Sequence, residues 1–130
     1  MQKLLLSVVL CCLLTHIGMA QNAELRIKNN SARSMTVKIM NKATNRLYKR
    51  VELSAYDEST TYFVSTGQFY CKTEARMYGR EPIYEKGNAF RVYVGDDGYS
   101  VLTISFSVSE SSQPDVLGGN RISKSEFDKN

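Results

Sequence analysis

At residues 69–77 the chain reads FYCKTEARM, with apolar or small residues at the odd positions and Tyr, Lys, Glu and Arg at the even ones. Such strict alternation is typical of a β-strand that is buried on one face and solvated on the other. Cys71 falls on the buried side, so we expect it to pack as a small hydrophobic residue rather than to react or cross-link two chains. The solvated side would carry Tyr70, Lys72 and Arg76.

The same period of two continues along the chain on both sides of this stretch. Six further strands are predicted at residues 25–28, 35–39, 47–53, 60–65, 89–94 and 99–108. The sequence GDDG at 95–98 predicts a tight hairpin between the last two, and Lys49 at an inward position predicts a bulge or a sheet edge. Short strands joined by polar turns predict an all-β fold, a single antiparallel β-sandwich of about seven strands with a polar C-terminal tail.

The first twenty residues resemble a secretory signal peptide. Lys3 supplies a positive start, an apolar run covers residues 4–14, and Gly18 and Ala20 place small residues where a signal peptidase would cleave. We therefore expect export, with cleavage near Ala20 and a secreted, periplasmic or cell-surface location. A lipid anchor on Cys11 and a retained membrane anchor are the alternatives that the sequence leaves open.

Three parts of the chain follow from this division. Residues 1–20 are the expected signal peptide, residues 21–108 the β-sandwich domain, and residues 109–130 a flexible tail with a composition rich in Ser, Gly and charged residues. Ile122 and Phe127 are the apolar anchors near its end, and they would either stay free or dock a last strand or helical turn onto the sandwich.

The residue inventory argues against catalysis. Beyond residue 20 the chain has no His and a single Cys, which excludes Ser-His-Asp and Cys-His machinery, an internal disulfide and a Cys-rich zinc site. The carboxylate pairs at 57–58 and 96–97 lie in predicted turns, and the second pair alone is too small a ligand set for calcium. We expect no catalytic residue, metal or cofactor. The triplet Asn29-Asn30-Ser31 matches a glycosylation acceptor, which chance also produces.

Charge is distributed unevenly along the chain, whose formal net charge is +4. Residues 21–91 carry 13 basic and 7 acidic side chains, whereas residues 92–130 carry 3 and 6. The stretch from Leu25 to Val51 has eight cations and no carboxylate. By alternation, Arg26, Lys28 and Lys38 project outward from neighbouring strands and would form a row that attracts an acidic polymer. The alternative is that these cations only keep strands soluble and protect sheet edges.

A second candidate surface combines tyrosine with arginine. It consists of Tyr70, Lys72 and Arg76 on one predicted strand and Arg91 and Tyr93 on the next. Exposed Tyr beside Arg is typical of protein-binding patches. Tyrosine is also a common residue on the solvent face of a strand, so a purely structural role is the alternative.

Three segments together show a resemblance to known domains. They are MTVKI at 35–39, KATN at 42–45 and TGQFYCK at 66–72. Their layout resembles that of transthyretin-like and carboxypeptidase-regulatory-like domains over roughly residues 33–108. The resemblance implies a small seven-stranded sandwich that serves as an accessory, folding or adhesion module in exported proteins, and it transfers no site residue.

These features predict an exported, non-enzymatic β-sandwich protein of the envelope or extracellular space. Its partner would be a protein or an anionic surface polymer, bound through the basic and Tyr-rich strand faces; we expect no nucleic acid and no transmembrane segment in the mature chain. The alternative is a structural or assembly subunit, homo-oligomers included, whose tail adds a strand to a neighbouring subunit.

Overall fold

The computed structural model describes residues 21–108 and 120–130. The expected signal peptide, with Cys11, lies outside this part of the chain, as do residues 109–119 of the predicted tail. The strands are β1 (Ala23–Asn29), β2 (Ser34–Asn41), β3 (Leu47–Leu53), β4 (Glu58–Phe63), β5 (Gly67–Arg76), β6 (Ile83–Lys86), β7 (Phe90–Val92), β8 (Val94–Gly95), β9 (Gly98–Tyr99), β10 (Val101–Phe106) and β11 (Asn120–Arg121), and a short helix, α2, covers Lys124–Asp128.

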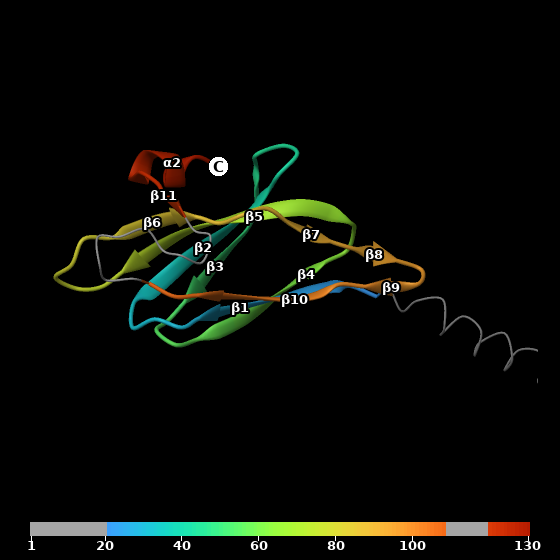
Figure 1. Cartoon of the computed structure of the whole chain (residues 1–130), viewed down its shortest axis with the longest axis horizontal. Coiled ribbons are helices and arrows are strands. Elements are labelled where there is room, and N and C mark those ends of the chain that lie inside the picture. The colour runs from blue at the N-terminus through green and yellow to red at the C-terminus, as the bar shows by residue number, and fades with distance from the viewer. Residues whose placement is uncertain (1–20, 109–119) are drawn as a thin grey trace, which may run out of the picture.

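Two sheets face each other in the layers that Figure 1 shows. The three-stranded sheet has the order β10-β1-β4, and the six-stranded sheet has the order β11-β6-β5-β2-β3, with β7 also paired to β5. Every pairing is antiparallel except that of β1 with β10, which is parallel. The predicted all-β antiparallel sandwich is therefore confirmed.

The core lies between the layers and is built from alternate residues of the facing strands. Leu25 and Ile27 of β1, Val37 and Ile39 of β2, and Phe63 of β4 are almost completely buried. Along each strand these residues alternate with side chains that point away from the core, because successive side chains of a strand point to opposite faces. The prediction for Cys71 holds as well, since its thiol is buried in this cluster.

Two local predictions are confirmed at the ends of strands. The pairing of β2 with β3 shifts register between Ile39 and Met40, opposite Lys49 and Leu47, and β3 is an edge strand. This bulge lets Lys49 stay exposed. The GDDG sequence forms the predicted hairpin, in which β8 pairs with β9.

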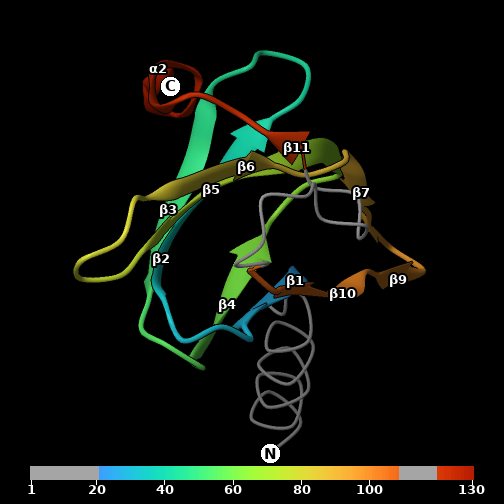
Figure 2. The ribbon, with the colours of Figure 1, turned by 60° about the vertical axis from the view of Figure 1, so that its left-hand side comes forward.

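Three elements lie outside the seven predicted strands: β6, β11 and α2. Residues 120–130, called the C-terminal segment below, contain β11 and α2. Of the two alternatives for Ile122 and Phe127, the structure therefore shows docking onto the sandwich and not a free tail. β11 pairs with β6 through Asn120 and Arg121, and Phe127 is buried. The segment lies on the outer face of the six-stranded sheet (Figure 2).

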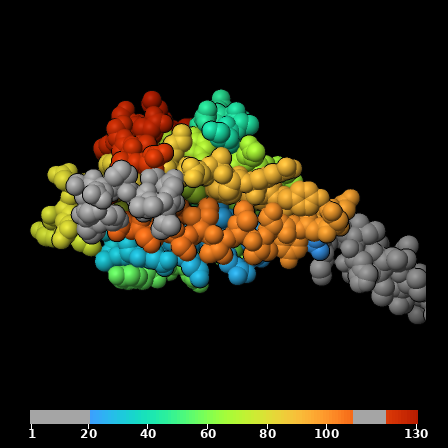
Figure 3. Space-filling view, viewed as in Figure 1, coloured from blue at the N-terminus to red at the C-terminus, as the bar shows by residue number. Residues whose placement is uncertain are grey.

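A second projection rises from the same outer face, the loop of residues 42–46 between β2 and β3. Asn41 shapes it, because its side-chain oxygen accepts hydrogen bonds from the backbone N–H groups of Ala43 and Thr44. Asn45 takes a left-handed φ of 54°, which Asn tolerates better than most residues. In the space-filling view this loop and the C-terminal segment stand as two separate projections (Figure 3).

Candidate functional site: a cationic row beneath the C-terminal segment

Four cations lie directly opposite one another on the outer face of the six-stranded sheet. Arg50 of β3 faces Lys38 of β2, Lys38 faces Lys72 of β5, and Lys72 faces Lys86 of β6. Residues in register on adjacent strands project to the same face, so these four side chains form one line, called the cationic row below. Like charges in directly opposite positions are destabilising, and the row therefore needs compensation.

The two central members of the row, Lys38 and Lys72, are called the inner pair, and the C-terminal segment covers them. Only 4% of Lys38 and 2% of Lys72 is exposed. The Lys38 ammonium donates to the backbone oxygen of Phe127 at 2.9 Å and to Oδ1 of Asn130 at 2.7 Å. These acceptors are uncharged.

The Lys72 ammonium is held in the same way. It donates to the backbone oxygen of Glu126 at 2.8 Å and to that of Lys129. These carbonyl groups lie at the C-terminal end of α2, where unpaired helix carbonyls carry partial negative charge. The sequence folds locally into this short helix because the side chain of Ser123 caps it, accepting from the Glu126 N–H.

The aromatic ring of Phe127 completes the cover. Its centroid lies 4.5 Å from the Lys38 Nζ, an arrangement in which the ring face attracts the cation. On its other side the ring packs against Tyr84 of β6, with 5.4 Å between centroids. One aromatic side chain thus shields the inner pair from water and anchors the C-terminal segment.

Burial changes the acid–base behaviour of the inner pair. Desolvation lowers the pKa of Lys38 below its ordinary value, an effect that Asp128 partly offsets. The pKa of Lys72 is lowered by desolvation and, next, by the positive charge of Lys38. No carboxylate in residues 21–108 or 120–130 forms an ion pair with either ammonium. Two neighbouring cations are therefore buried with neutral ligands only.

Tyr70 lies beside the inner pair, next to the loop of residues 42–46. Its hydroxyl donates to the side-chain oxygen of Asn45 at 3.2 Å, and 6% of the residue is exposed. The ammonium groups of Lys86 and Lys42 lie 4.8 and 5.6 Å from its ring centroid. Burial, followed by the nearby charge of Glu126, raises the pKa of the Tyr70 hydroxyl. Tyr70 thus links the row to the loop.

The β2–β3 hairpin extends the positive charge into solvent. Lys42, Arg46, Lys49 and Arg50 are exposed. Arg50 pairs with Glu52 at 2.9 Å. Among the described residues, the other three form no ion pair, which leaves their charge available to a partner.

Arg76 belongs to a different and internally balanced part of this face. It is paired with Glu74 and, at 3.3 Å, with Glu52, and it donates to the Thr36 hydroxyl at 2.6 Å. Although burial opposes ionisation of Glu52, hydrogen bonds from Thr36, Arg50 and Arg76 hold the pKa of that carboxyl below its ordinary value. The Arg76 charge is therefore largely compensated within the protein.

The structure corrects the predicted row of Arg26, Lys28 and Lys38. Arg26 and Lys28 lie on β1, in the three-stranded sheet, whereas Lys38 lies on β2, in the other sheet. All three point outward, as alternation predicts, but from opposite sides of the sandwich. Alternation separates inside from outside and carries no information about which sheet a strand joins.

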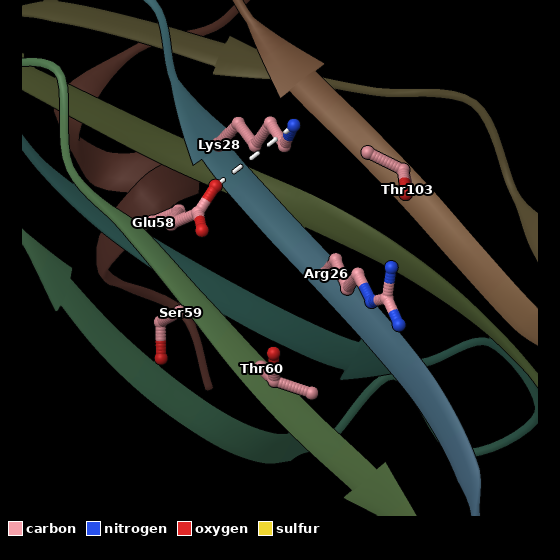
Figure 4. Close-up of a pocket in the computed structure, with 6 residues that line it drawn as sticks. All are labelled: Arg26, Lys28, Glu58, Ser59, Thr60 and Thr103. Atoms are coloured by element: carbon pink, nitrogen blue, oxygen red, sulfur yellow. Dashed lines mark ion pairs between the residues drawn. The ribbon is translucent and has the colours of Figure 1, made fainter.

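Arg26 and Lys28 line a shallow depression on the three-stranded sheet, together with Glu58, Ser59, Thr60 and Thr103 (Figure 4). Lys28 lies 3.9 Å from Glu58, and Arg26 lies 3.4 Å from Glu24. This face thus balances much of its own positive charge.

The second predicted surface is divided. Tyr70, Lys72 and Arg76 do lie on the outward side of β5, but Tyr70 and Lys72 are buried rather than exposed. Arg91 of β7 lies opposite Gln68, towards the other end of β5, and is exposed. The hydroxyl of Tyr93 donates to Asp97 at 2.6 Å in the β8–β9 hairpin. The five residues do not form one patch.

Lys86 and Arg50 are functional candidates that sequence reasoning missed. Lys86 lies on β6, a four-residue strand in which every residue is half-buried, so the sequence gives no clear alternation there. Arg50 was part of the basic stretch, but its position in the row depends on pairing across three strands. No local signal could have revealed either.

Two other residues that the sequence singled out, Asn29 and Cys71, have structural roles. Asn29 of the glycosylation triplet is 1% exposed, and its amide donates to the backbone oxygens of Arg33 and Ser54, so it is inaccessible to a glycan. Burial raises the pKa of the Cys71 thiol to about 12. No group of three or more His, Cys, Asp or Glu suited to a metal occurs in the described ranges, and no helix there is long and apolar enough to cross a membrane.

Comparison with known proteins adds no relative. No family model matches the chain, and neither the curated proteins nor the solved structures give a match. The resemblance to transthyretin-like and carboxypeptidase-regulatory-like domains thus stays a prediction, and the function has to be argued from the cationic row and the hairpin beside it.

Proposed function

We propose that this chain is an exported, non-enzymatic β-sandwich protein that binds an acidic polysaccharide of the envelope or extracellular space through its basic face. The basic face consists of Lys42, Arg46, Arg50 and Lys86, on the outer side of the six-stranded sheet. The observation that carries the proposal is the exposed loop of residues 42–46, whose cations Lys42 and Arg46 have no carboxylate partner among the described residues.

The shape of this face favours a linear polymer over a flat surface. Adjacent strands lie about 4.8 Å apart, so the four members of the cationic row span roughly 15 Å in a line. The loop of residues 42–46 and the C-terminal segment both rise above the sheet (Figure 1). A bilayer would meet these projections first, whereas a single polysaccharide chain can follow the exposed cations of the loop and Arg50 beside it.

The charge balance of the two outer faces also supports this choice of face. On the three-stranded sheet, Lys28 and Arg26 both have acidic neighbours within 4 Å, whereas on the basic face Arg50 alone forms an ion pair among the described residues. Exposed cations without such neighbours attract a polyanion more strongly, because no internal ion pair has to be broken. The assembly-subunit alternative has less support, since Asn120 and Arg121, the strand-forming part of the tail that is described, pair with β6 of the same chain.

Retention on immobilised heparin, a sulfated polysaccharide, tests the proposal. The double variant Lys42→Glu/Arg46→Glu should elute at lower salt, with an apparent affinity reduced about tenfold or more, because two exposed cations become repulsive. The matched control is Arg26→Glu/Lys28→Glu, which makes the same change of net charge on the other sheet. Equal loss in both variants would show that only net charge matters and would reject the basic face.

A further inference from the structure

The inner pair is a charged site whose present ligands are poorly matched to it. Lys38 and Lys72 lie opposite each other on adjacent strands and are nearly inaccessible to solvent. Their ammonium groups donate hydrogen bonds to three backbone carbonyl oxygens and to one side-chain amide oxygen. Buried charges are normally paired with opposite charge, because neutral dipoles replace only part of the lost hydration. Two anionic groups would satisfy this site better than the ligands it has.

Apart from the hydrogen bonds of the inner pair and the ion pair of Arg121 with Glu85 at 3.2 Å, few contacts attach the C-terminal segment to the sheet. Two residue pairs join β11 to β6, and the Ile122 N–H donates to the Tyr84 carbonyl at 2.9 Å. Phe127 is its one fully buried side chain, and it lies outside the hydrophobic cluster between the sheets. A segment with so few buried contacts opens at a lower free-energy cost than the strands beneath it.

We infer that the inner pair is a binding site for two anionic groups of a linear acidic polysaccharide, and that the C-terminal segment is a displaceable cover occupying this site in the free protein. The inference rests on the proposed function and adds a second, concealed part to the same face. Arg50 and Lys86 flank the inner pair in the row. A chain bound at the exposed Arg50 and the half-buried Lys86 already runs along the line on which Lys38 and Lys72 lie.

The cover makes binding depend on opening. When only the open state exposes the inner pair, the apparent affinity falls by the fraction of molecules that are open. Conversely, a polysaccharide that occupies the inner pair holds the C-terminal segment in the open state. Binding and release of residues 120–130 should therefore be coupled in both directions.

The variant Phe127→Ala removes the anchor of the cover without touching the sandwich core. In the full-length protein it should raise the affinity for heparin about tenfold, because a larger fraction of the molecules is then open and able to bind at the inner pair. The milder variant Ser123→Ala removes only the helix cap and should give a smaller gain in the same direction. Adding Lys38→Gln and Lys72→Gln to Phe127→Ala should abolish the gain. Arg26→Gln and Lys28→Gln together, on the other sheet, remove the same number of charges; this is the matched control and should leave the gain intact.

Hydrogen exchange measures the cover directly. In the wild-type protein, heparin should accelerate exchange of the Ile122 and Phe127 N–H groups, which are hydrogen-bonded to Tyr84 and Ser123 in the closed state. If heparin binds through the exposed hairpin while these amides and the affinity of Phe127→Ala stay unchanged, the cover is refuted and the proposed function stands. If heparin does not bind, or only anionic lipid vesicles do, the proposed function itself is refuted.

Discussion

Thr61 and Thr36 form a natural pair for testing how buried hydroxyl groups affect the stability of this sandwich. Both side chains are on strands, and both residues are 0% exposed. Thr61 faces the core from β4, and its Oγ1 has no hydrogen-bond partner among the described residues. Thr36 lies on the outer side of β2, where its hydroxyl donates to Glu52 at 2.8 Å and accepts from Arg76 at 2.6 Å.

Replacing either threonine with valine keeps the branched shape and removes the hydroxyl. A buried hydroxyl without a partner costs about 1–3 kcal/mol, so Thr61→Val should raise the free energy of unfolding by about 1 kcal/mol once imperfect packing is included. For a domain of this size that corresponds to a rise in Tm of about 4 °C. Thr36→Val should instead lower the free energy of unfolding by about 1–2 kcal/mol, because it removes hydrogen bonds to charged groups.

Urea unfolding followed by circular dichroism measures both changes on the same scale. The slope of the transition should be unchanged in both variants, which would show that only the native state is altered. Destabilisation of Thr61→Val by more than about 1 kcal/mol, with little change in Thr36→Val, would refute the reasoning, since the internal hydroxyl would then be the better satisfied of the two.

Three further predictions concern buried polar and ionisable groups. The Cys71 thiol, whose pKa burial raises to about 12, should stay unreactive towards a thiol reagent at about pH 8 until the protein is unfolded; rapid modification of the native protein would contradict its placement. Asn29→Ala should cost about 2–4 kcal/mol in urea unfolding, because the Arg33 and Ser54 carbonyls each lose a donor, whereas a surface change at Asn88 should have little effect. Folding lowers the pKa of Lys38 and Lys72 below the ordinary value of 10.5. At a pH between the lowered pKa and 10.5, the unfolded chain therefore binds more protons than the folded protein, and the contribution of these two lysines to the free energy of unfolding rises with pH. Wild type should therefore gain stability relative to Lys38→Met/Lys72→Met as the pH approaches 10.5, and a constant difference would argue against the lowered pKa.

Much of the fold was accessible from the sequence because strand alternation is a local property. At residues 69–77 it correctly assigned Cys71 to the inner face of the strand and Lys72 to the outer face, and the GDDG sequence correctly predicted the hairpin. The assignment of strands to sheets was not accessible in this way. For this reason Arg26 and Lys28 were grouped with Lys38, although the sandwich lies between them.

The cationic row was less accessible than the fold, because it depends on register. Lys72 meets Lys86 only because the turn after β5 brings a short, half-buried strand back at that position. The cover depends on still longer-range contacts, in which Lys38 donates to Phe127 and Asn130 near the other end of the chain. The apolar residues at 122 and 127 suggested docking, but no local pattern specified where.

The parallel pairing of β1 with β10 has a consequence for how the protein folds. Arg26 lies beside Thr103, so the three-stranded sheet cannot close until almost the entire sandwich sequence is present in one compartment. Contacts between such distant residues are slow to form, because a long loop must be ordered first. For an exported chain of the kind proposed here, this delay would keep it open enough to be threaded through a translocation channel, with closure of the sheet following on the far side.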